Sequence, residues 1–187
     1  TFVAVGANST VLTSINGTTW TSQTLGTASI ALRAVAQNAG TLIATAGDGT
    51  IYRSTNGGVA ANTGVTWAPA VITGGNTQSL GAVAFGGSNW VAVGNAGTVF
   101  TSPTGATWTL TPAANTPPAT GGSTNNLATL AYGNGQFITA FGSPYTSTDG
   151  ALWSGSVFSP ANGSTMSAAL YANGQFIFGG FAGGIYT

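Results

Sequence analysis

Only four side chains in this sequence of 187 residues are charged: Asp48, Asp149, Arg33 and Arg53. Two carboxylates that flank one sugar bond are the machinery of a glycoside hydrolase, and an arginine beside them would bind an anionic group of the substrate. Whether these four residues meet depends on the elements that carry them. The chemistry open to them is therefore set by the fold.

The composition excludes many kinds of functional site. The chain has no Lys, Glu, His or Cys, so it has no imidazole base, no thiolate nucleophile, no disulfide and no ordinary zinc or copper site. Two isolated aspartates fall short of the oxygen ligands of a calcium loop. With 2% charged residues and a net charge of +0, the chain offers no electrostatic attraction to nucleic acid or anionic lipid. We therefore expect no cofactor, no metal and no nucleic-acid partner.

The same composition predicts an all-β protein. The 30 glycines and the many Thr, Asn and Val residues are unfavourable for helices, and the helix formers Lys and Glu are missing. A hydrophobic content of 43% is enough for a sizeable core. The segment 166–186 carries no charge, but its Asn, Gln and Gly residues divide it into short strand-like pieces. We expect no membrane insertion.

One short pattern recurs along the chain. It reads TSINGTTW at 13–20, RSTNGGVAANTGVTW at 53–67, TSPTGATW at 101–108 and TSTDGALW at 146–153. A second segment precedes each copy, as FVAVG at 2–6, LIATAG at 42–47, WVAVG at 90–94 and FITAFG at 137–142, and it occurs again as FIFGG at 176–180. The sequence is therefore divided into repeats at about 1–31, 32–79, 80–126, 127–165 and 166–187.

Each complete repeat predicts four short strands, A to D, joined by tight turns. Strand A is a segment such as LGAVA, strand B one such as WVAVG, and strand C one such as GTVFTS, while strand D begins at the Trp. Four-stranded units of about 40 residues are typical of the blades of β-propellers. We therefore predict a single β-propeller domain of antiparallel blades, or a fragment of a larger one.

The two ends of the chain differ from the complete repeats. The first repeat starts at strand B, and the fifth stops after strand C. The sequence also opens on Thr1, as expected of a processed or truncated chain. Because bare strand edges invite association, we expect the chain to be a piece of a longer array, or neighbouring chains to complete its end blades.

The pattern Ser-x-Asp-Gly-x-x-Trp at 147–153 resembles the Asp-box, or bacterial neuraminidase repeat, of sialidase-type β-propellers. The resemblance extends over nearly the whole chain through the related copies. Asp-boxes occur in sialidases, other glycoside hydrolases, sortilin-like receptors and photosystem II assembly factors. In these families the box is a structural turn on the side of the propeller away from the ligand face. The resemblance therefore implies a fold rather than a reaction.

The residues at the box positions favour a structural role. The acidic position holds Asn16, Asn56, Thr104 and Asp149 in turn, and a turn needs only a side-chain oxygen that accepts a backbone N–H. We expect the box glycines to adopt positive φ and the box tryptophans to pack between blades. The remaining box residues are Ser14, Ser54, Ser102 and Ser147, then Gly17, Gly57, Gly105 and Gly150, and finally Trp20, Trp67, Trp108 and Trp153.

The two aspartates are not expected to meet. Asp48 lies in a turn between strands B and C and Asp149 in a turn between strands C and D, and such turns lie on opposite faces of a blade. By the resemblance, a sialidase site would also need an arginine cluster and a Tyr–Glu pair, but the chain has two Arg and no Glu. We therefore predict no catalytic residues and no enzyme. A non-catalytic fragment of a sialidase-type glycoside hydrolase is one alternative.

The two arginines are the candidate ligand-binding residues. Arg53 replaces the Thr that stands in strand C of the other repeats. Arg33 lies in strand A, which would line the central channel, where a guanidinium can bind an anion or instead bond to carbonyl groups at a strand end. Among the aromatic residues, Phe158 and Trp90 are candidates for stacking on sugars, but core packing is favoured for Trp90, since it replaces the Phe or Leu of strand B.

Two long loops, 109–126 and 154–165, are polar and uncharged. Such loops bind carbohydrate or neighbouring subunits, or they are solvated connectors. Asn8, Asn16 and Asn162 fit the pattern of N-glycosylation acceptors.

These features together predict a non-catalytic structural or adhesion module outside the cell or on its surface. A nearly uncharged chain has little colloidal repulsion, which suits a surface layer, filament or appendage better than a crowded cytoplasm. The absence of cysteine is compatible with export. The expected partners are copies of the chain, neighbouring repeats or glycans, and the alternative function is that of a carbohydrate-binding, lectin-like propeller.

Overall fold

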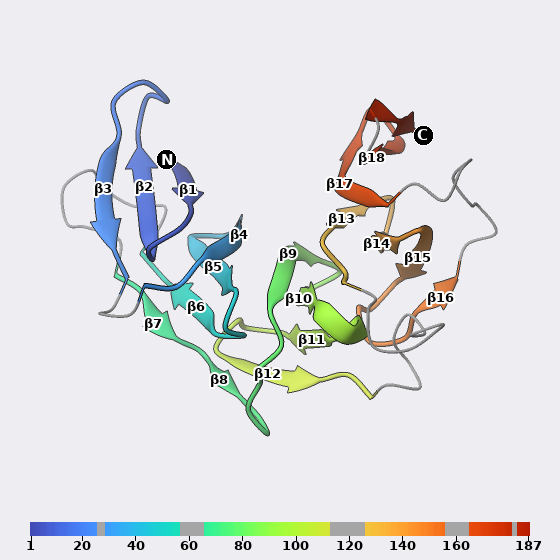
Figure 1. The fold of residues 1–187 in the computed structure, drawn as a ribbon, viewed down its shortest axis with the longest axis horizontal. Helices are drawn as coiled ribbons and strands as arrows, with labels where there is room; N and C mark the ends of the chain where they lie inside the picture. The colour runs from blue at the N-terminus through green and yellow to red at the C-terminus, as the bar shows by residue number, and fades with distance from the viewer. Residues whose placement is uncertain (26–28, 57–65, 113–125, 156–164, 181–182) are drawn as a thin grey trace.

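The computed structural model describes residues 1–25, 29–56, 66–112, 126–155, 165–180 and 183–187 (Figure 1). Within these ranges the protein is all-β, as predicted, apart from one short 3-10 turn at Asn95–Gly97. None of the described helices is long and apolar enough to cross a membrane.

The strands form five separate sheets, each made from one stretch of sequence. The first sheet contains β1 (Phe2–Val5), β2 (Thr10–Ser14) and β3 (Thr21–Thr24). The second contains β4 (Leu32–Asn38), β5 (Thr41–Ala46), β6 (Ile51–Ser54) and β7 (Ala68–Pro69). The third contains β9 (Leu80–Gly86), β10 (Asn89–Gly94), β11 (Val99–Ser102) and β12 (Thr107–Leu110), with β8 (Val71–Ile72) at its edge. The fourth contains β13 (Leu130–Gly133), β14 (Gln136–Phe141), β15 (Ser143–Ser147) and β16 (Ser154–Gly155), and the fifth contains β17 (Met166–Ala172), β18 (Gln175–Gly180) and β19 (Ile185–Tyr186).

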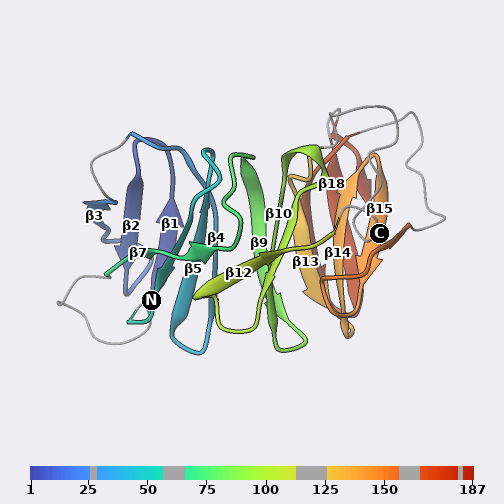
Figure 2. The ribbon, with the colours of Figure 1, turned by 90° about the horizontal axis from the view of Figure 1, so that it is seen from below.

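The sheets stand side by side in an open arc. Figure 1 shows β4, β9, β13 and β17 on the inner side of the arc, and the first and fifth sheets on either side of its opening. In the view of Figure 2 the strands run up and down, so successive turns of each antiparallel meander alternate between the two ends of the sheet. The five sheets of the described residues do not close into a ring.

One strand was not predicted. The two-residue strand β8 follows the second sheet in sequence but pairs in parallel with β12 of the third sheet. Val71 N–H donates to the carbonyl of Ala106 at 2.9 Å, and Thr73 N–H donates to that of Trp108 at 3.0 Å. This strand therefore ties the second sheet to the third by backbone hydrogen bonds.

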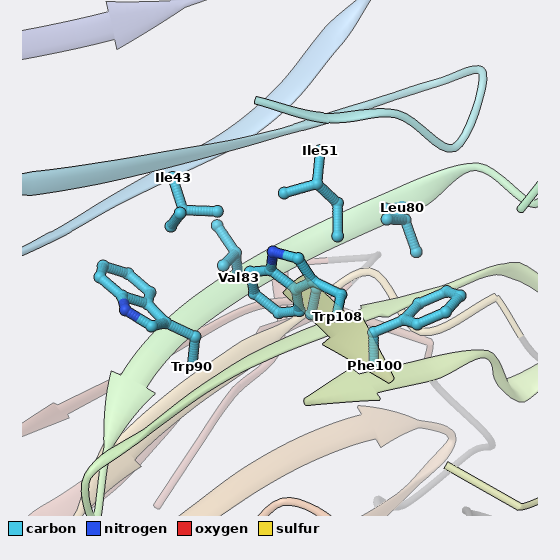
Figure 3. Close-up of a cluster of buried hydrophobic side chains, with 8 residues drawn as sticks. Ile43, Ile51, Leu80, Val83, Trp90, Phe100 and Trp108 are labelled. Atoms are coloured by element: carbon cyan, nitrogen blue, oxygen red, sulfur yellow. The ribbon is translucent and has the colours of Figure 1, made fainter. Parts of the chain in front are cut away.

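Hydrophobic clusters fill the spaces between neighbouring sheets. The cluster between the second and third sheets is shown in Figure 3, where Ile43 and Ile51 of the second sheet face Trp108 of the third. Trp108 is 0% exposed, and Trp90 is 2% exposed, as expected for a core residue. Similar clusters join the first sheet to the second, the third to the fourth and the fourth to the fifth. Because side chains of two sheets meet in each cluster, each sheet depends on its neighbour for burial.

Glycine permits two close approaches between neighbouring sheets. A Cβ on Gly86 of the third sheet would overlap the ring of Tyr132 in the fourth, and one on Gly133 of the fourth sheet would overlap the ring of Tyr171 in the fifth. A residue with a Cβ is therefore excluded at the equivalent position of the third and the fourth sheets.

Candidate functional site

The box around Asp149 is closed by hydrogen bonds to one carboxylate oxygen. Oδ1 of Asp149 accepts the N–H of Ala151 at 2.8 Å and the N–H of Leu152 at 2.9 Å. It also accepts the hydroxyl of Ser147 at 3.0 Å. The hydrogen bond from Leu152 is the main cause that lowers the pKa of Asp149 below its ordinary value of 3.8. The carboxylate is therefore held ionised by the turn that it closes.

A neutral amide makes the same hydrogen bonds in the first box. Oδ1 of Asn16 accepts the N–H groups of Thr18 and Thr19, each at 2.9 Å, and the hydroxyl of Ser14 at 3.1 Å. A side chain at this box position therefore closes the turn without a negative charge.

The other two boxes vary the acceptor further. Oγ1 of Thr104 accepts the N–H of Ala106 at 3.3 Å. Oδ1 of Asn56 accepts the hydroxyl of Ser54 at 2.9 Å and the N–H of Thr66 at 3.1 Å. Gly57 of this box lies outside the described residues.

Serine, glycine and tryptophan complete the turn in the three boxes whose glycine is described. The N–H groups of the box glycines donate to the box serines at 2.8 to 2.9 Å in three boxes, and the indole N–H groups donate to the glycine carbonyls at 2.9 to 3.2 Å. The glycines have φ between +74° and +78°, where an L side chain is strained. These three glycines are Gly17, Gly105 and Gly150, and the corresponding tryptophans are Trp20, Trp108 and Trp153.

The boxes are also contacts between sheets. A Cβ on Gly105 would lie 2.6 Å from Cδ1 of Ile43 in the second sheet, and one on Gly150 would overlap Cγ2 of Val91 in the third. The amide of Asn89 in the third sheet donates to the carbonyl of Asp149 in the fourth at 3.2 Å. Each of these boxes therefore rests on the sheet that precedes it.

Arg53 makes a polar contact from the second sheet to the box of the third sheet, as Asn89 does from the third sheet to the box of the fourth. Its Nε donates to the carbonyl of Thr104 at 3.2 Å.

Asn89 was not recognised as a contact residue from the sequence. A polar residue does recur directly before strand B, as Thr41, Asn89, Gln136 and Gln175, and this recurrence is the signal that could have identified it.

The two aspartates lie in different sheets and in different kinds of turn. Asp48 is in the turn between β5 and β6, where its carboxylate accepts the N–H of Thr50 at 3.0 Å. Asp149 is in the turn between β15 and β16, at the other end of the strands. Burial and, to a lesser degree, the charge of Asp48 raise the pKa of Tyr52. No group of three acidic or other metal-binding side chains occurs among the described residues.

Arg33 lies on the inner strand β4, but its side chain is exposed. The register of β4 and β5 shifts between Leu32 and Ala34, so Arg33 is the extra residue of a β-bulge. Its Nε lies 3.4 Å from the position that a Cβ on Gly47 would occupy. The guanidinium therefore lies beside the backbone of Gly47 in its own sheet.

Arg53 lines a pocket of about 210 Å³ on the second sheet. Both Arg53 and Trp67 are half-buried, and Thr55 and Thr66 are exposed. The pocket thus combines a guanidinium, an indole ring and two hydroxyls. Its described lining residues are Arg53, Thr55, Thr66, Trp67, Ala68, Pro69, Ala70 and Ala106.

Two of the three candidate glycosylation residues are placed by the structure. Asn8 is exposed, and its side-chain oxygen accepts the hydroxyl of Ser29 at 2.8 Å. Asn16 is exposed, but its side chain is held in the box turn. Asn162 and Phe158, like most of the loops 109–126 and 154–165, lie outside the described residues.

The sequence matches no protein-family model and no curated protein. Its structural neighbours are β-propeller-like proteins. YCF48 bound to D1 peptide has 16% sequence identity and a TM-score of 0.67, with 98% of this chain and 58% of that chain covered. Virginiamycin B lyase from Staphylococcus aureus with quinupristin has 10% identity and a TM-score of 0.73, with 94% and 61% covered. The computationally designed Ika4 protein has 17% identity and a TM-score of 0.57, with 87% and 93% covered.

At these identities the comparison concerns the fold alone. The chain spans 58% of the YCF48 chain and 61% of the lyase chain. The coarse prediction of an all-β, propeller-like fold is therefore confirmed.

Proposed function

We propose that this chain is a non-catalytic structural or adhesion module of an extracellular layer, filament or appendage. In this proposal its sheets are blades of an Asp-box β-propeller with incomplete first and last blades. The observation that carries the proposal is the equivalence of Asp149 and Asn16, which accept the same three hydrogen bonds in their turns. Since a neutral amide replaces the carboxylate, the motif requires an acceptor and not an acid.

The charge distribution supports this role. The carboxylates of Asp48 and Asp149 each accept hydrogen bonds within a local turn, and the two turns belong to different sheets. A net charge of +0 with 2% charged residues gives little repulsion between copies. A surface of hydroxyls, amides and glycine suits contacts with glycans and with other copies of the chain. The peptide complex of YCF48 supports protein partners for a fold of this kind.

Immunogold electron microscopy of the producing cells tests the proposed location. An antibody against the chain is expected to label the cell surface or extracellular filaments on intact cells. A surface protein of known position is the positive control, and a cytoplasmic protein is the negative control. Label confined to the cytoplasm of sectioned cells would contradict the proposal.

A second candidate function, carbohydrate binding, is favoured by the pocket at Arg53. An indole ring stacks on the apolar face of a sugar, hydroxyls bond to sugar hydroxyls, and a guanidinium binds the carboxylate of an acidic sugar. Of the two arginines, Arg53 lines a cavity, whereas Arg33 lies exposed beside Gly47.

A glycan array separates this candidate from the structural role. Saturable binding that is lost in Arg53→Thr, the residue found at the same position in the third sheet, would favour a lectin. Arg33→Thr is the matched control, and it should retain binding. Absence of saturable binding would count against the lectin function and leave the structural role in place.

A further inference from the structure

Two hairpin turns of the protein consist of an asparagine followed by a glycine. Asn134 and Gly135 join β13 to β14, and Asn173 and Gly174 join β17 to β18. All four residues have φ between +48° and +81°, as in the type I′ turn that suits a two-residue hairpin. All four are also exposed. Asparagine is among the thermolabile residues of proteins, so its surroundings in these turns have chemical consequences.

Nothing among the described residues holds the two asparagine side chains in place. The carboxamides of Asn134 and Asn173 make no hydrogen bond to a described residue. A Cβ on Gly135 or on Gly174 would have nothing within 4 Å. Cγ of each asparagine can therefore approach the backbone nitrogen of the following glycine in open space, and no side chain on that glycine obstructs the approach.

The exposure of this turn does not depend on a missing neighbour. Ala39 and Gly87 occupy the position of Asn134 in the hairpins of the second and third sheets. Each of these sheets packs against the sheet that follows it. Ala39 and Gly87 are nevertheless exposed. Contact with solvent is therefore a property of the hairpin turn itself.

The same dipeptide is held by hydrogen bonds in the first box. Oδ1 of Asn16 accepts the N–H groups of Thr18 and Thr19, each at 2.9 Å, and the hydroxyl of Ser14 at 3.1 Å. The N–H of Gly17 donates to Oγ of Ser14 at 2.9 Å. Both the carboxamide and the backbone nitrogen beside it are therefore engaged in the box turn.

We propose that Asn134 and Asn173 are sites of spontaneous deamidation, and that the box turn protects Asn16 from the same reaction. The backbone nitrogen of the glycine attacks Cγ of the asparagine and forms a C–N bond. The carboxamide nitrogen leaves as ammonia and takes the proton of the glycine N–H with it. Water then opens the cyclic imide at one of its two C–N bonds. Cleavage of the bond to Cγ gives aspartate, and cleavage of the bond to the main-chain carbonyl carbon gives isoaspartate.

The modification changes the charge of the protein. Each event replaces a neutral carboxamide with a carboxylate, in a chain whose net charge is +0 and whose charged residues amount to 2%. Isoaspartate also lengthens the main chain of a turn that has two residues. The chain therefore gains negative charge with time, and with it the repulsion between copies that its composition otherwise lacks.

Peptide mapping of the folded chain tests the proposal. The protein is incubated in mildly alkaline buffer, digested with pepsin at acid pH and analysed by mass spectrometry, which detects the replacement of NH2 by OH. Asn134 and Asn173 should react about tenfold or more faster than Asn16, because Asn16 must first break its hydrogen bonds. Separate peptides report the Asn-Gly pairs at 56–57 and 162–163, which extend outside the described residues.

Two controls separate the effect of the fold from that of the local sequence. In urea that unfolds the chain, Asn16, Asn134 and Asn173 should react at similar rates, because the hydrogen bonds of the box are lost. Ser14→Ala removes the acceptor for the N–H of Gly17 and should raise the rate at Asn16 about fivefold or more, with no change at Asn134. Circular dichroism monitors the fold of this variant.

Three results would overturn the proposal. The first is a folded chain in which Asn16 reacts as fast as Asn134 or Asn173. The second is a difference between these sites that persists in the unfolded chain. The third is a folded Ser14→Ala variant whose rate at Asn16 is unchanged. None of these results bears on the extracellular location, which immunogold labelling tests independently.

Discussion

Replacement of Asp149 by Asn and by Ala separates its charge from its hydrogen bonds. The Asn variant keeps an oxygen that can accept the N–H groups of Ala151 and Leu152, as Asn16 does in the first box. The Ala variant loses the acceptor for both N–H groups and for the hydroxyl of Ser147. The structure therefore predicts a small effect for Asn and a larger one for Ala.

The expected loss of stability depends on the exposure of Asp149. Asp149 is exposed, so water can replace part of what the Ala variant loses. Loss of a comparable capping side chain costs about 1 kcal/mol of unfolding free energy. For a chain of this size, that corresponds to a fall in melting temperature of about 2–4 °C. The Asn variant should change the unfolding free energy by less than about 0.5 kcal/mol, as an ordinary surface substitution does.

Urea unfolding, followed by tryptophan fluorescence, measures both variants. Asp48→Asn and Asp48→Ala are the matched controls, because Asp48 accepts one backbone N–H, from Thr50, and no box depends on it. The cost of Asp48→Ala should therefore be below that of Asp149→Ala. An Asp149→Asn variant that is as unstable as Asp149→Ala would refute the reasoning, since the charge and not the acceptor would then be required.

The other predictions concern the same turns. Gly105→Ala should lower the unfolding free energy by more than about 1 kcal/mol, because φ is +74° and the new Cβ would lie 2.6 Å from Ile43; an unchanged denaturation midpoint would contradict this. Trp108→Ala, at a fully buried site, should lower the unfolding free energy by about 3–5 kcal/mol in the same assay. Trp20→Ala, at a site that is 41% exposed, should cost less than half as much. Equal costs would count against the packing of Trp108 between the second and third sheets. Because the turn lowers the pKa of Asp149 in the folded state, the ionised carboxylate stabilises the fold at pH values above the ordinary pKa of 3.8, and this contribution is lost as the pH falls through the lower folded pKa. Asp149→Asn should remove this part of the acid dependence of the melting temperature. A variant whose melting temperature depends on pH as that of the unchanged chain does would contradict this prediction.

The sequence predicted the sheets and turns well because their signals are local. Within the first, third and fourth boxes, the serine, the acceptor, the glycine and the tryptophan interact over three residues or fewer, as the bond from Trp108 to Gly105 shows. Alternating apolar residues and the turns between them likewise identify strands without reference to distant parts of the chain.

The features that the sequence did not reveal depend on neighbours in space. The strand β8 is two residues long and exists because it pairs with β12, so it has no periodicity of its own. The bulge at Arg33 is a shift in pairing, not a residue pattern. Trp20 and Trp108 have the same local motif and differ in exposure, 41% against 0%, because Trp108 packs against Ile43 and Ile51 of the second sheet.

The claim that box tryptophans join neighbouring sheets by packing is tested most directly by a double-mutant cycle between Trp108 and Ile51, with Trp108→Phe and Ile51→Ala. The two side chains belong to different sheets and meet in one buried cluster (Figure 3). We expect a coupling free energy of about 0.5–3 kcal/mol in urea unfolding. The cycle between Trp20→Phe and Ile51→Ala is the control and should be additive within about 0.5 kcal/mol. Additivity for Trp108 and Ile51 as well would contradict the claim.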